Sequence, residues 1–271
     1  MSSRTSPESQ TLSFYPAPPP PLELQVSTSS EHACPYLSGR IALSRGFQCR
    51  RVPGWAHQLL MDAGFRRSGK IFYQPVCPGC RACTALRVRV GSFRPGKSLR
   101  RIERRNRDLS LGFGVPSLTD EKHALYRRYL ERRHDGKMAS EREDLEAFLY
   151  RSPTETLEVC YRGPGGRLLA VGICDRTPVA LSSVYFYFDP DEGPRSLGTF
   201  GSLVELRLAE SLGLAYYYPG FWIEGCRKMS YKTRLRPCEL LGTDAVWRPF
   251  EELGEAAELA RGPLTLRGSG Q

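Results

Sequence analysis

Hydrophobic residues recur with two different spacings along the second half of the chain, and these spacings predict helices and strands in a definite order. Apolar positions every three or four residues predict helices over residues 119–133 and 141–150, the first with Thr119 as its N-cap. Apolar and alternating runs then predict an antiparallel meander of three strands, an apolar helix and a short aromatic strand. These five segments are residues 156–161, 167–174, 179–188, 199–212 and 215–218.

The first half carries shorter elements of both kinds. Leu86, Val88 and Val90 alternate with arginines, as in a half-buried strand. Glycine and proline between residues 91 and 96 interrupt this pattern before a basic helix. The expected elements are a helix over 55–63, a strand over 65–73 that contains the turn-forming Ser68-Gly69, a strand over 85–90, a helix over 97–107 and a strand over 108–115.

The order of elements in the second half is the outline of a Gcn5-type acyltransferase domain. We therefore predict an α+β protein with a C-terminal Gcn5-type acyltransferase-like domain over residues 117–250 and a smaller mixed N-terminal domain over residues 34–116. The first half repeats the order weakly, so the two domains are expected to be divergent duplicates. Residues 1–33, rich in serine and proline, are predicted to be a disordered tail, and residues 251–271 a second tail.

The apolar content argues against a membrane protein. The longest apolar run, from Leu168 to Cys174, is far shorter than the roughly 20 residues that a transmembrane helix needs. The first thirty residues have no continuous apolar core and do not resemble a secretory signal. We therefore expect a cytoplasmic protein with no membrane partner, whose nine cysteines are reduced thiols or metal ligands rather than disulfides.

The charge of the chain points to a polyanionic partner. The formal net charge is +10, and arginine dominates the excess. In the predicted helix over 97–107, a spacing of three and four residues places four cations on one face, where they would contact RNA phosphates. These residues are Lys97, Arg101, Arg104 and Arg105. The alternative is an ordinary solvated helix surface.

Cysteines form the sharpest local motif. Cys77, Cys80 and Cys83 make two overlapping C-x-x-C turns, and Cys34 upstream is a candidate fourth ligand. Four thiolates suit zinc or an iron-sulfur cluster. The alternative is a tight turn whose thiols hold its shape without metal, and the sequence leaves both open.

A second dense motif covers residues 216–232, which read YYYPGFWIEGCRKMSYK. Aromatic rings that can stack on bases alternate here with one carboxylate and three cations that can hold phosphates. The alternative is the aromatic edge of a core followed by a basic loop. The close alternation of polar and aromatic residues favours a binding site.

Several ordered motifs resemble the arginyl-tRNA-protein transferase family, and most closely its bacterial branch. They are Cys34-Pro-Tyr, Gly64-Phe-Arg-Arg-Ser-Gly-Lys70, the CPGCRAC run, Phe188-Asp-Pro-Asp, Ser196-Leu-Gly198, and Gly225-Cys-Arg-Lys-Met-Ser-Tyr-Lys232 with Arg236-Pro237. The resemblance covers about residues 34–250. It implies transfer of leucine from leucyl-tRNA to proteins that begin with Asp or Glu, which marks them for N-end-rule degradation. The eukaryotic branch transfers arginine, so the residues alone leave the donor open.

The chemistry of such a reaction assigns hypothetical roles. The donor ester is already activated and an α-amine has a pKa of roughly 8, so positioning can supply much of the acceleration and no cofactor is required. We expect Glu224 to orient or deprotonate the amine, Tyr231 or Lys228 to assist the departing ribose hydroxyl, and Arg66, Arg67 or Lys70 to bind the acidic side chain. Further substrate-binding candidates are Tyr185, Asp189, Gly198, Trp222 and Lys232.

Two other classes of protein fit parts of the sequence. An acetyl-CoA N-acetyltransferase would carry a pyrophosphate loop of the form R/Q-x-x-G-x-G/A between strand and helix. Residues 195–200 read RSLGTF, and Phe200 replaces the small residue that lets the backbone approach the pyrophosphate. A metal-dependent nucleic-acid-binding protein would explain the charge and the cysteines but not the motif over residues 216–232.

Overall fold

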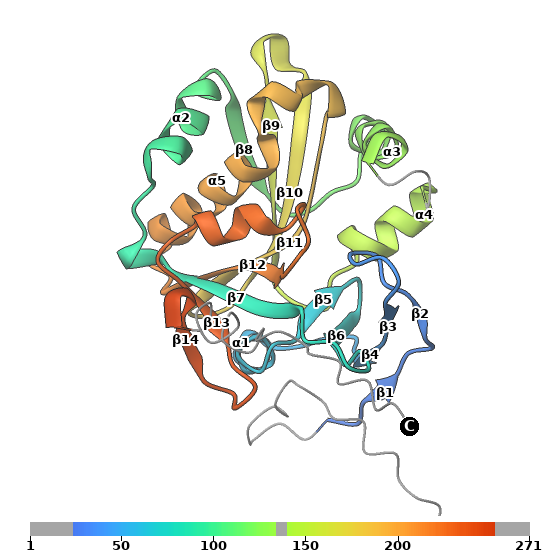
Figure 1. Cartoon of the computed structure of the whole chain (residues 1–271). Coiled ribbons are helices and arrows are strands. Elements are labelled where there is room, and N and C mark those ends of the chain that lie inside the picture. Colours follow the sequence, from blue (N-terminus) through green and yellow to red (C-terminus); the bar gives the residue numbers. More distant parts are fainter. Residues whose placement is uncertain (1–23, 134–139, 253–271) are drawn as a thin grey trace, which may run out of the picture.

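A computed structural model describes residues 24–133 and 140–252 and centres on one eight-stranded sheet (Figure 1). Neighbouring strands in this sheet are antiparallel except β11 and β12, which are parallel. In spatial order the strands are β14 Trp247–Pro249, β13 Cys238–Leu241, β7 Cys83–Arg89, β12 Tyr216–Ile223, β11 Ala180–Phe188, β10 Leu168–Arg176, β9 Thr156–Arg162 and β8 Ser110–Gly114. The α+β class is therefore confirmed.

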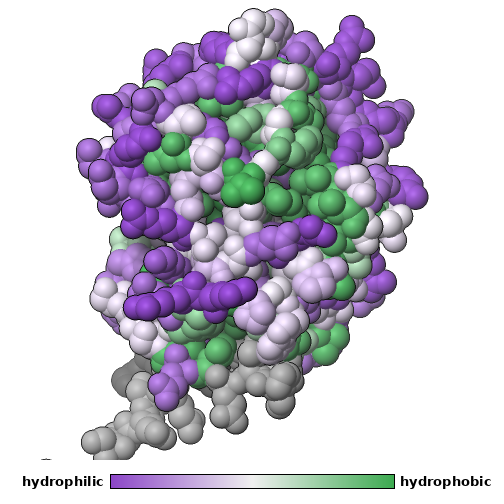
Figure 2. Space-filling model, turned by 180° about the vertical axis from the view of Figure 1, so that it is seen from behind, coloured by the Kyte–Doolittle hydropathy of each residue, from purple (hydrophilic) through white to green (hydrophobic). Residues whose placement is uncertain are grey.

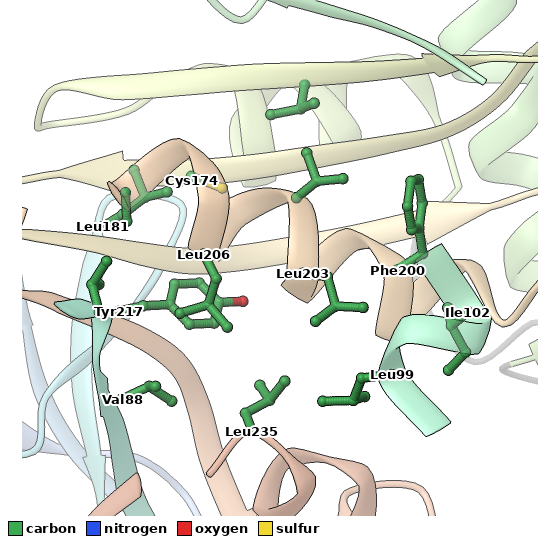
Figure 3. Packing of buried hydrophobic residues seen from close by; sticks show 14 of the residues in the cluster. Val88, Leu99, Ile102, Cys174, Leu181, Phe200, Leu203, Leu206, Tyr217 and Leu235 are labelled. Carbon is green, nitrogen blue, oxygen red and sulfur yellow. The ribbon is translucent and has the colours of Figure 1, made fainter. Parts of the chain in front are cut away.

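Helices pack on both faces of the large sheet. One face carries α5 (Leu197–Ser211) and α2 (Lys97–Arg105), whose apolar side chains form the main core with β7 and β12 (Figure 3). The other face carries α3 (Asp120–Arg133), α4 (Arg142–Leu145) and the π-type turn η2 (Glu146–Tyr150). Side chains alternate along β10, so Ala170 packs toward α5 whereas Val171 packs toward α3.

A smaller unit from the N-terminal part of the chain adjoins this layered core. Its four-stranded sheet has the order β1-β4-β6-β5, and helix α1 (Gly54–Asp62) supplies Ala56 and Leu60 to its apolar cluster. These strands are β1 Ser27–Thr28, β4 Ser44–Gln48, β6 Ile71–Pro75 and β5 Arg66–Ser68, and a separate pair joins β2 His32–Ala33 to β3 Ile41–Ala42.

The expected domain division at residues 116 and 117 runs through a single sheet. Strands β7 and β8 come from the N-terminal part, yet they pair with β12, β13 and β9. Strands β1 and β2 lie inside the segment that was expected to be a tail, so the folded chain begins before Cys34. The rest of the two expected tails, residues 1–23 and 253–271, lies outside the described residues. That the two halves are divergent duplicates stays a prediction.

Strand β12 is longer than the sequence predicts, and the reason lies in its neighbour β11. The parallel pairing joins only Ala180–Ser182 to Tyr216–Tyr218, after which the strands diverge. Pro219 lacks the N–H that a strand in the middle of a sheet needs for pairing. At this position β12 no longer pairs with β11, and its pairing with β7 shifts register between Tyr217 and Gly220. We call this divergence of β11 beyond Ser182 and β12 beyond Tyr218 the splay.

The connection across the splay completes the Gcn5-type order of elements. The meander β9-β10-β11 leads through α5 back to β12, parallel to β11.

None of the described helices is both long and apolar enough to cross a bilayer. On the side opposite to that of Figure 1, hydrophobic residues gather over the middle of the surface and hydrophilic residues border them (Figure 2).

Candidate active site

A bulge in β11 lies where the splay begins. Opposite β10, Ile173 pairs with Tyr185 and Cys174 pairs with Ser183, so Val184 has no pairing partner across this pair of strands. A bulge bends its strand and increases its twist. The local break in β11 therefore helps to separate this strand from β12.

Arg66 bridges the two strands at the mouth of the splay. Its guanidinium Nη2 donates hydrogen bonds to the carbonyl of Ser183 on β11, at 3.3 Å, and to the carbonyl of Tyr218 on β12, at 3.1 Å. The β5–β6 hairpin of the small sheet delivers this side chain, which is buried. The sequence prediction of Arg66 as a site residue therefore has a structural setting between the two diverging strands.

Lys232 brings a second buried cation to the same place. Its Nζ donates to the carbonyl of Phe221 at 2.8 Å. A Cβ atom on Gly220, which has φ +98°, would lie 3.1 Å from this Nζ and 3.8 Å from Arg66 Nη2. Burial, and next the charge of Arg66, lower the pKa of Lys232 to about 7. Across the described ranges, neither cation forms an ion pair, so the site holds positive charge that an anionic ligand would neutralise.

Tyr73 and Tyr218 lie beside Arg66. Tyr218 donates from its hydroxyl to Asp62 at 2.6 Å, and the Arg66 guanidinium lies 5.9 Å from its ring centre. Burial raises the pKa of Tyr73, and the positive charge of Arg66 lowers it in part. Tyr185, another predicted substrate-binding residue, belongs to an aromatic cluster with Tyr126, and burial raises its pKa as well. The rings of Tyr73 and Tyr218 thus help to exclude water from the Arg66 guanidinium.

Arg67, another candidate for binding the acidic side chain, is engaged inside the fold rather than open to a substrate. It follows Arg66 on β5, so its side chain points to the opposite face of the strand. It is buried and donates to both carboxylate oxygens of Asp175, at 2.6 and 2.8 Å, and to the carbonyl of Gly69. Lys70 lies in the exposed turn between β5 and β6.

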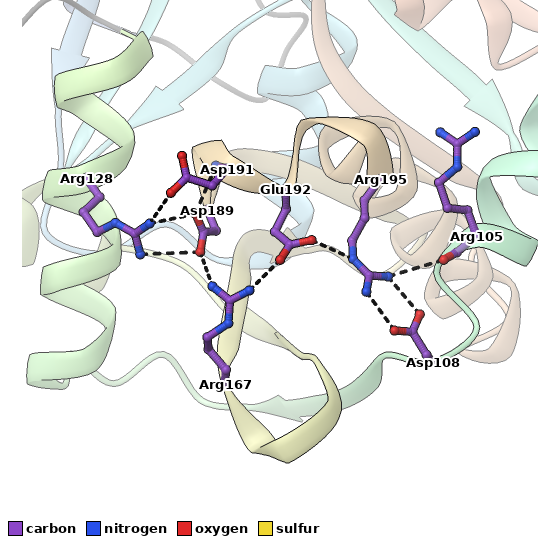
Figure 4. Close-up of polar contacts among 8 residues, drawn as sticks. All are labelled: Arg105, Asp108, Arg128, Arg167, Asp189, Asp191, Glu192 and Arg195. Atoms are coloured by element: carbon purple, nitrogen blue, oxygen red, sulfur yellow. Dashed lines mark hydrogen bonds and ion pairs between the residues drawn. The ribbon is translucent and has the colours of Figure 1, made fainter.

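Asp189 is likewise engaged inside the fold rather than open to a substrate. Its buried carboxylate accepts hydrogen bonds from Arg128 at 3.0 Å and Arg167 at 2.6 Å, within a chain of ion pairs around the turn η4 (Pro190–Arg195) (Figure 4). Arg195 donates to Asp108 and to Glu192. This arginine, which starts the RSLGTF segment, is therefore occupied by carboxylates, and the segment is poorly suited to a CoA pyrophosphate.

Gly198 lies in the first turn of α5, close to the ring of Phe188. Trp222 on β12 packs edge to face on Phe250, with ring centres 5.5 Å apart, at the border of the main core. A contact of either residue with substrate stays a prediction.

The three predicted catalytic residues follow β12 in the chain. Glu224 comes directly after the strand, half-buried, with its backbone N–H bonded to the carbonyl of Ala82. Lys228 lies in the exposed turn beyond it. Tyr231 belongs to the turn η5 (Ser230–Arg234), and burial raises its pKa to about 12, with the charge of Glu205 as the next cause. Their catalytic roles stay predictions.

The basic face of α2 has the expected geometry. Leu99 and Ile102 are buried against the core, and the four predicted cations lie on the exposed side of the helix. Arg105 also donates to the carbonyl of Pro194. Contact of Lys97, Arg101, Arg104 and Arg105 with RNA stays a prediction.

The cysteines gather, but the structure does not support a metal centre. Burial raises the pKa of Cys83 to about 12, and the neighbouring thiols of Cys77, Cys34 and Cys80 add to the effect. In the part of the chain that the structure describes, no three or more His, Cys, Asp or Glu side chains are arranged to hold a metal ion. The Sγ atoms of Cys34 and Cys77 instead accept backbone N–H groups at 3.4 Å. These contacts favour the alternative of thiols that hold a turn, and zinc or an iron-sulfur cluster has no support.

Sequence reasoning missed Glu205, a buried carboxylate on α5. Its Oε2 accepts the hydroxyl hydrogen of Tyr217 at 2.6 Å, and burial raises its pKa to about 7. The signal was present in the sequence, because Glu205 is an acidic residue inside a run that is otherwise apolar, from Leu203 to Leu206. The helix is buried on nearly all sides there, which its single-face apolar pattern did not reveal.

The fold and the site define an acyltransferase class: a Gcn5-type sheet with a parallel pair that splays, and buried charged groups where it opens. Two family models narrow this class. The N-terminal model, described as "Arginine-tRNA-protein transferase, N terminus", matches residues 32–101, and the corresponding C-terminal model matches residues 121–242.

Curated relatives agree over nearly the whole chain. A protein of Hahella chejuensis is 38% identical over 239 residues, which cover 87% of this chain and 97% of the relative. One of Parvibaculum lavamentivorans is 41% identical over 228 residues, covering 83% and 94%. Both are named aspartate/glutamate leucyltransferase. The chain belongs to the arginine-tRNA-protein transferase family, as its motifs predict.

Solved structures are more distant. FemX matches with a TM-score of 0.47 and 9% identity over 73% of this chain and 69% of its own. The C-terminal domain of a putative lysylphosphatidylglycerol synthetase from Agrobacterium fabrum has a TM-score of 0.45 and 15% identity, covering 84% and 89%. Neither likeness is close enough to carry a functional argument.

Proposed function

We propose that the protein transfers leucine from leucyl-tRNA to the N-terminal amine of proteins that begin with Asp or Glu. The observation that carries this proposal is the pair of buried cations, Arg66 and Lys232, at the splay. Relatives that are 38% and 41% identical bear the name aspartate/glutamate leucyltransferase, which supports leucine as the donor amino acid. Arginyl transfer by the same chemistry is the alternative.

The cation pair accounts for selection of an acidic acceptor. A carboxylate between Arg66 and Lys232 would accept charge-assisted hydrogen bonds from both in a site of low dielectric. A neutral side chain would leave Arg66 buried and unpaired and would not offset the cost of protonating Lys232, whose pKa is about 7. The site therefore favours Asp and Glu, whose carboxylates bind the cations, and disfavours Asn and Gln, which leave buried charge unpaired.

The reaction needs one proton transfer. The acceptor amine attacks the ester carbonyl carbon, the bond to the ribose oxygen breaks, and the proton of the amine must reach that oxygen. Glu224 is proposed to orient the amine. Tyr231, whose raised pKa of about 12 keeps it protonated at neutral pH, or Lys228 would supply the proton to the ribose oxygen. Positioning and these groups suffice without a cofactor.

The tRNA is proposed to bind along the exposed face of α2. Lys97, Arg101, Arg104 and Arg105 would neutralise phosphates there. Since charged tRNA is a cytoplasmic substrate, the proposal also gives the protein a cytoplasmic location.

A matrix of donors and acceptors tests this function. The protein is incubated with tRNA charged separately with leucine or arginine, and with peptides that begin with Asp, Glu, Lys or Arg. We expect leucine on the Asp and Glu peptides alone. Arginine on those peptides would establish the alternative donor, and no transfer in any combination would refute aminoacyl transfer. To test the alternative of an acetyl-CoA N-acetyltransferase, acetyl-CoA is added to the protein, and it should leave the melting temperature unchanged.

A further inference from the structure

We propose that Glu205 anchors the α-ammonium group of the amino acid that the donor tRNA carries. This inference rests on the proposed function, because an aminoacyl donor has an ammonium group beside its ester whereas a simple acyl donor has none. It names a binding group for the donor, on a different element from the cations proposed for the acceptor.

The carboxylate of Glu205 is only half satisfied by the protein. It is 1% exposed, and Oε2 accepts the Tyr217 hydroxyl at 2.6 Å. Among the described residues, Oε1 is buried without a hydrogen-bond partner. Buried polar atoms nearly always have a partner, and an ionised carboxylate oxygen is among the strongest acceptors. The free oxygen is therefore matched to a donor that the described chain does not supply.

This oxygen lies near the point where β11 and β12 stop pairing and begin to diverge. Tyr217 belongs to the last stretch of β12 that pairs with β11. Ser183, whose side chain lies near Glu205, is the first residue of β11 beyond that stretch. On β10, a Cβ atom on Gly172 would come within 3.1 Å of Oε1. Glycine at this position lets the oxygen approach the backbone of β10 closely. The carboxylate thus lies where the sheet opens, on the side of α5.

Among the residues that the structure describes, no cation lies beside Glu205 as an ion-pair partner. The titratable groups that face it from the packed elements are Tyr217 on β12, Cys174 on β10, Tyr161 on β9 and Tyr231 on η5. All four are neutral at pH 7, because burial raises each of their pKa values. A primary ammonium would supply both the missing charge and the missing hydrogen-bond donor.

The three charged groups of the site then divide the substrates between them. Arg66 and Lys232 attract the carboxylate of the acceptor, and Glu205 attracts the ammonium of the donor. Tyr231 lies near Glu205, whose charge raises the pKa of Tyr231 after burial, and its side chain is partly exposed at the surface. Opposite signs at the two positions would prevent the substrates from exchanging places.

The test compares leucyl-tRNA with the same tRNA carrying the α-hydroxy analogue of leucine. The wild type is expected to prefer leucyl-tRNA by about tenfold or more in kcat/KM, the usual effect of one charge-assisted hydrogen bond. Glu205→Gln is expected to lower this preference to about twofold, chiefly through a higher KM for leucyl-tRNA, with the KM for an Asp-starting peptide unchanged. Glu210→Gln, on an exposed position of the same helix, is the matched control and should keep the preference.

A wild type without the preference, or a folded Glu205→Gln protein that retains it, overturns the assignment. Equal losses with both donors would show a structural role and also overturn it. If Glu205→Gln does not fold, Glu205→Asp is used, which keeps the carboxylate but shortens the side chain by one methylene. An unchanged preference for leucyl-tRNA over its α-hydroxy analogue in that protein counts against Glu205 as the group that binds the ammonium. No transfer by the wild type from either donor would instead refute the proposed function itself.

Discussion

Lys232 and Arg66 meet at Gly220, where a Cβ atom would lie 3.1 Å from Lys232 Nζ and 3.8 Å from Arg66 Nη2. One cation comes from the small N-terminal sheet and the other from the turn after β12, so folding of both parts is needed to form the pair. Their repulsion and burial hold the pKa of Lys232 near 7, far below the ordinary value of a lysine. Such an arrangement destabilises the fold and favours binding of an anion.

Gly220→Ala is expected to damage both the fold and the site. Its φ of +98° is unfavourable for a residue with a Cβ, and the new methyl would contact Lys232 Nζ. We expect a loss of about 1–3 kcal/mol in the free energy of unfolding and a raised KM for an Asp-starting peptide. Urea unfolding and peptide kinetics measure these. Gly91→Ala, at a position with open space around it, is the control and should change neither.

The pKa of Lys232 predicts a pH dependence of stability. Between about pH 7 and 10.5, the unfolded chain holds a proton on this side chain that the folded protein has released. The folded state therefore gains stability as pH rises through this window, by at most about 1.4 kcal/mol per pH unit. The difference in unfolding free energy between the wild type and Lys232→Met should rise from pH 7 to pH 9. A flat difference would mean that Lys232 keeps its proton.

Glu205 predicts the opposite trend at lower pH. Its folded pKa is raised from 4.5 to about 7, so between these values the folded protein binds a proton that the unfolded chain has lost. Stability of the wild type should therefore fall relative to Glu205→Gln as pH rises from 4.5 to 7. Denaturant unfolding of both proteins across this range measures the trend. A constant difference would show that Glu205 titrates normally.

Asp175→Asn should affect stability but not specificity. The substitution leaves Arg67 buried without its bidentate partner, which typically costs about 3–5 kcal/mol. Asp175 hydrogen-bonds to Arg67 and acts on Arg66 only through its charge, so the folded fraction should keep the wild-type preference for Asp over Asn peptides. A changed preference would show that Arg67 takes part in binding the acidic side chain of the acceptor.

The basic face of α2 should determine the salt dependence of tRNA binding. The double substitution Arg101→Glu and Arg104→Glu is expected to weaken binding and to reduce the slope of log K against log salt by about one per lost phosphate contact. Filter binding at several salt concentrations measures it. Arg176→Glu removes an exposed arginine of β10 that pairs with Glu155, the residue before β9. This control should leave the slope unchanged, and equal effects of both changes would argue against a specific face.

Local patterns were sufficient for most of the fold. The meander, α5 and the basic face of α2 follow from spacing within short segments. The second half of β12 was not predicted, because Pro219-Gly220 normally ends a strand and only the departure of β11 makes it tolerable. The short β13 and β14 are fixed by pairing with distant strands rather than by their own residues.

The site was predictable in part. Arg66 and Lys232 were both candidates, but their meeting at one glycine depends on tertiary contacts. The sequence could not distinguish Arg66 from Arg67, because that difference requires knowing which face of β5 meets Asp175. Glu205 was overlooked because its significance comes from burial on all sides of α5.

The central claim is that Arg66 and Lys232 select acidic acceptors, and the ratio of kcat/KM for an Asp-starting peptide to that for the matching Asn peptide tests it most directly. The wild type should favour Asp by about a hundredfold or more, as expected when buried charges are left unpaired by the wrong substrate. Lys232→Met should reduce this ratio at least about tenfold, whereas Lys70→Met, in the exposed β5–β6 turn, should preserve it. An unchanged ratio in a folded Lys232→Met protein would contradict the account.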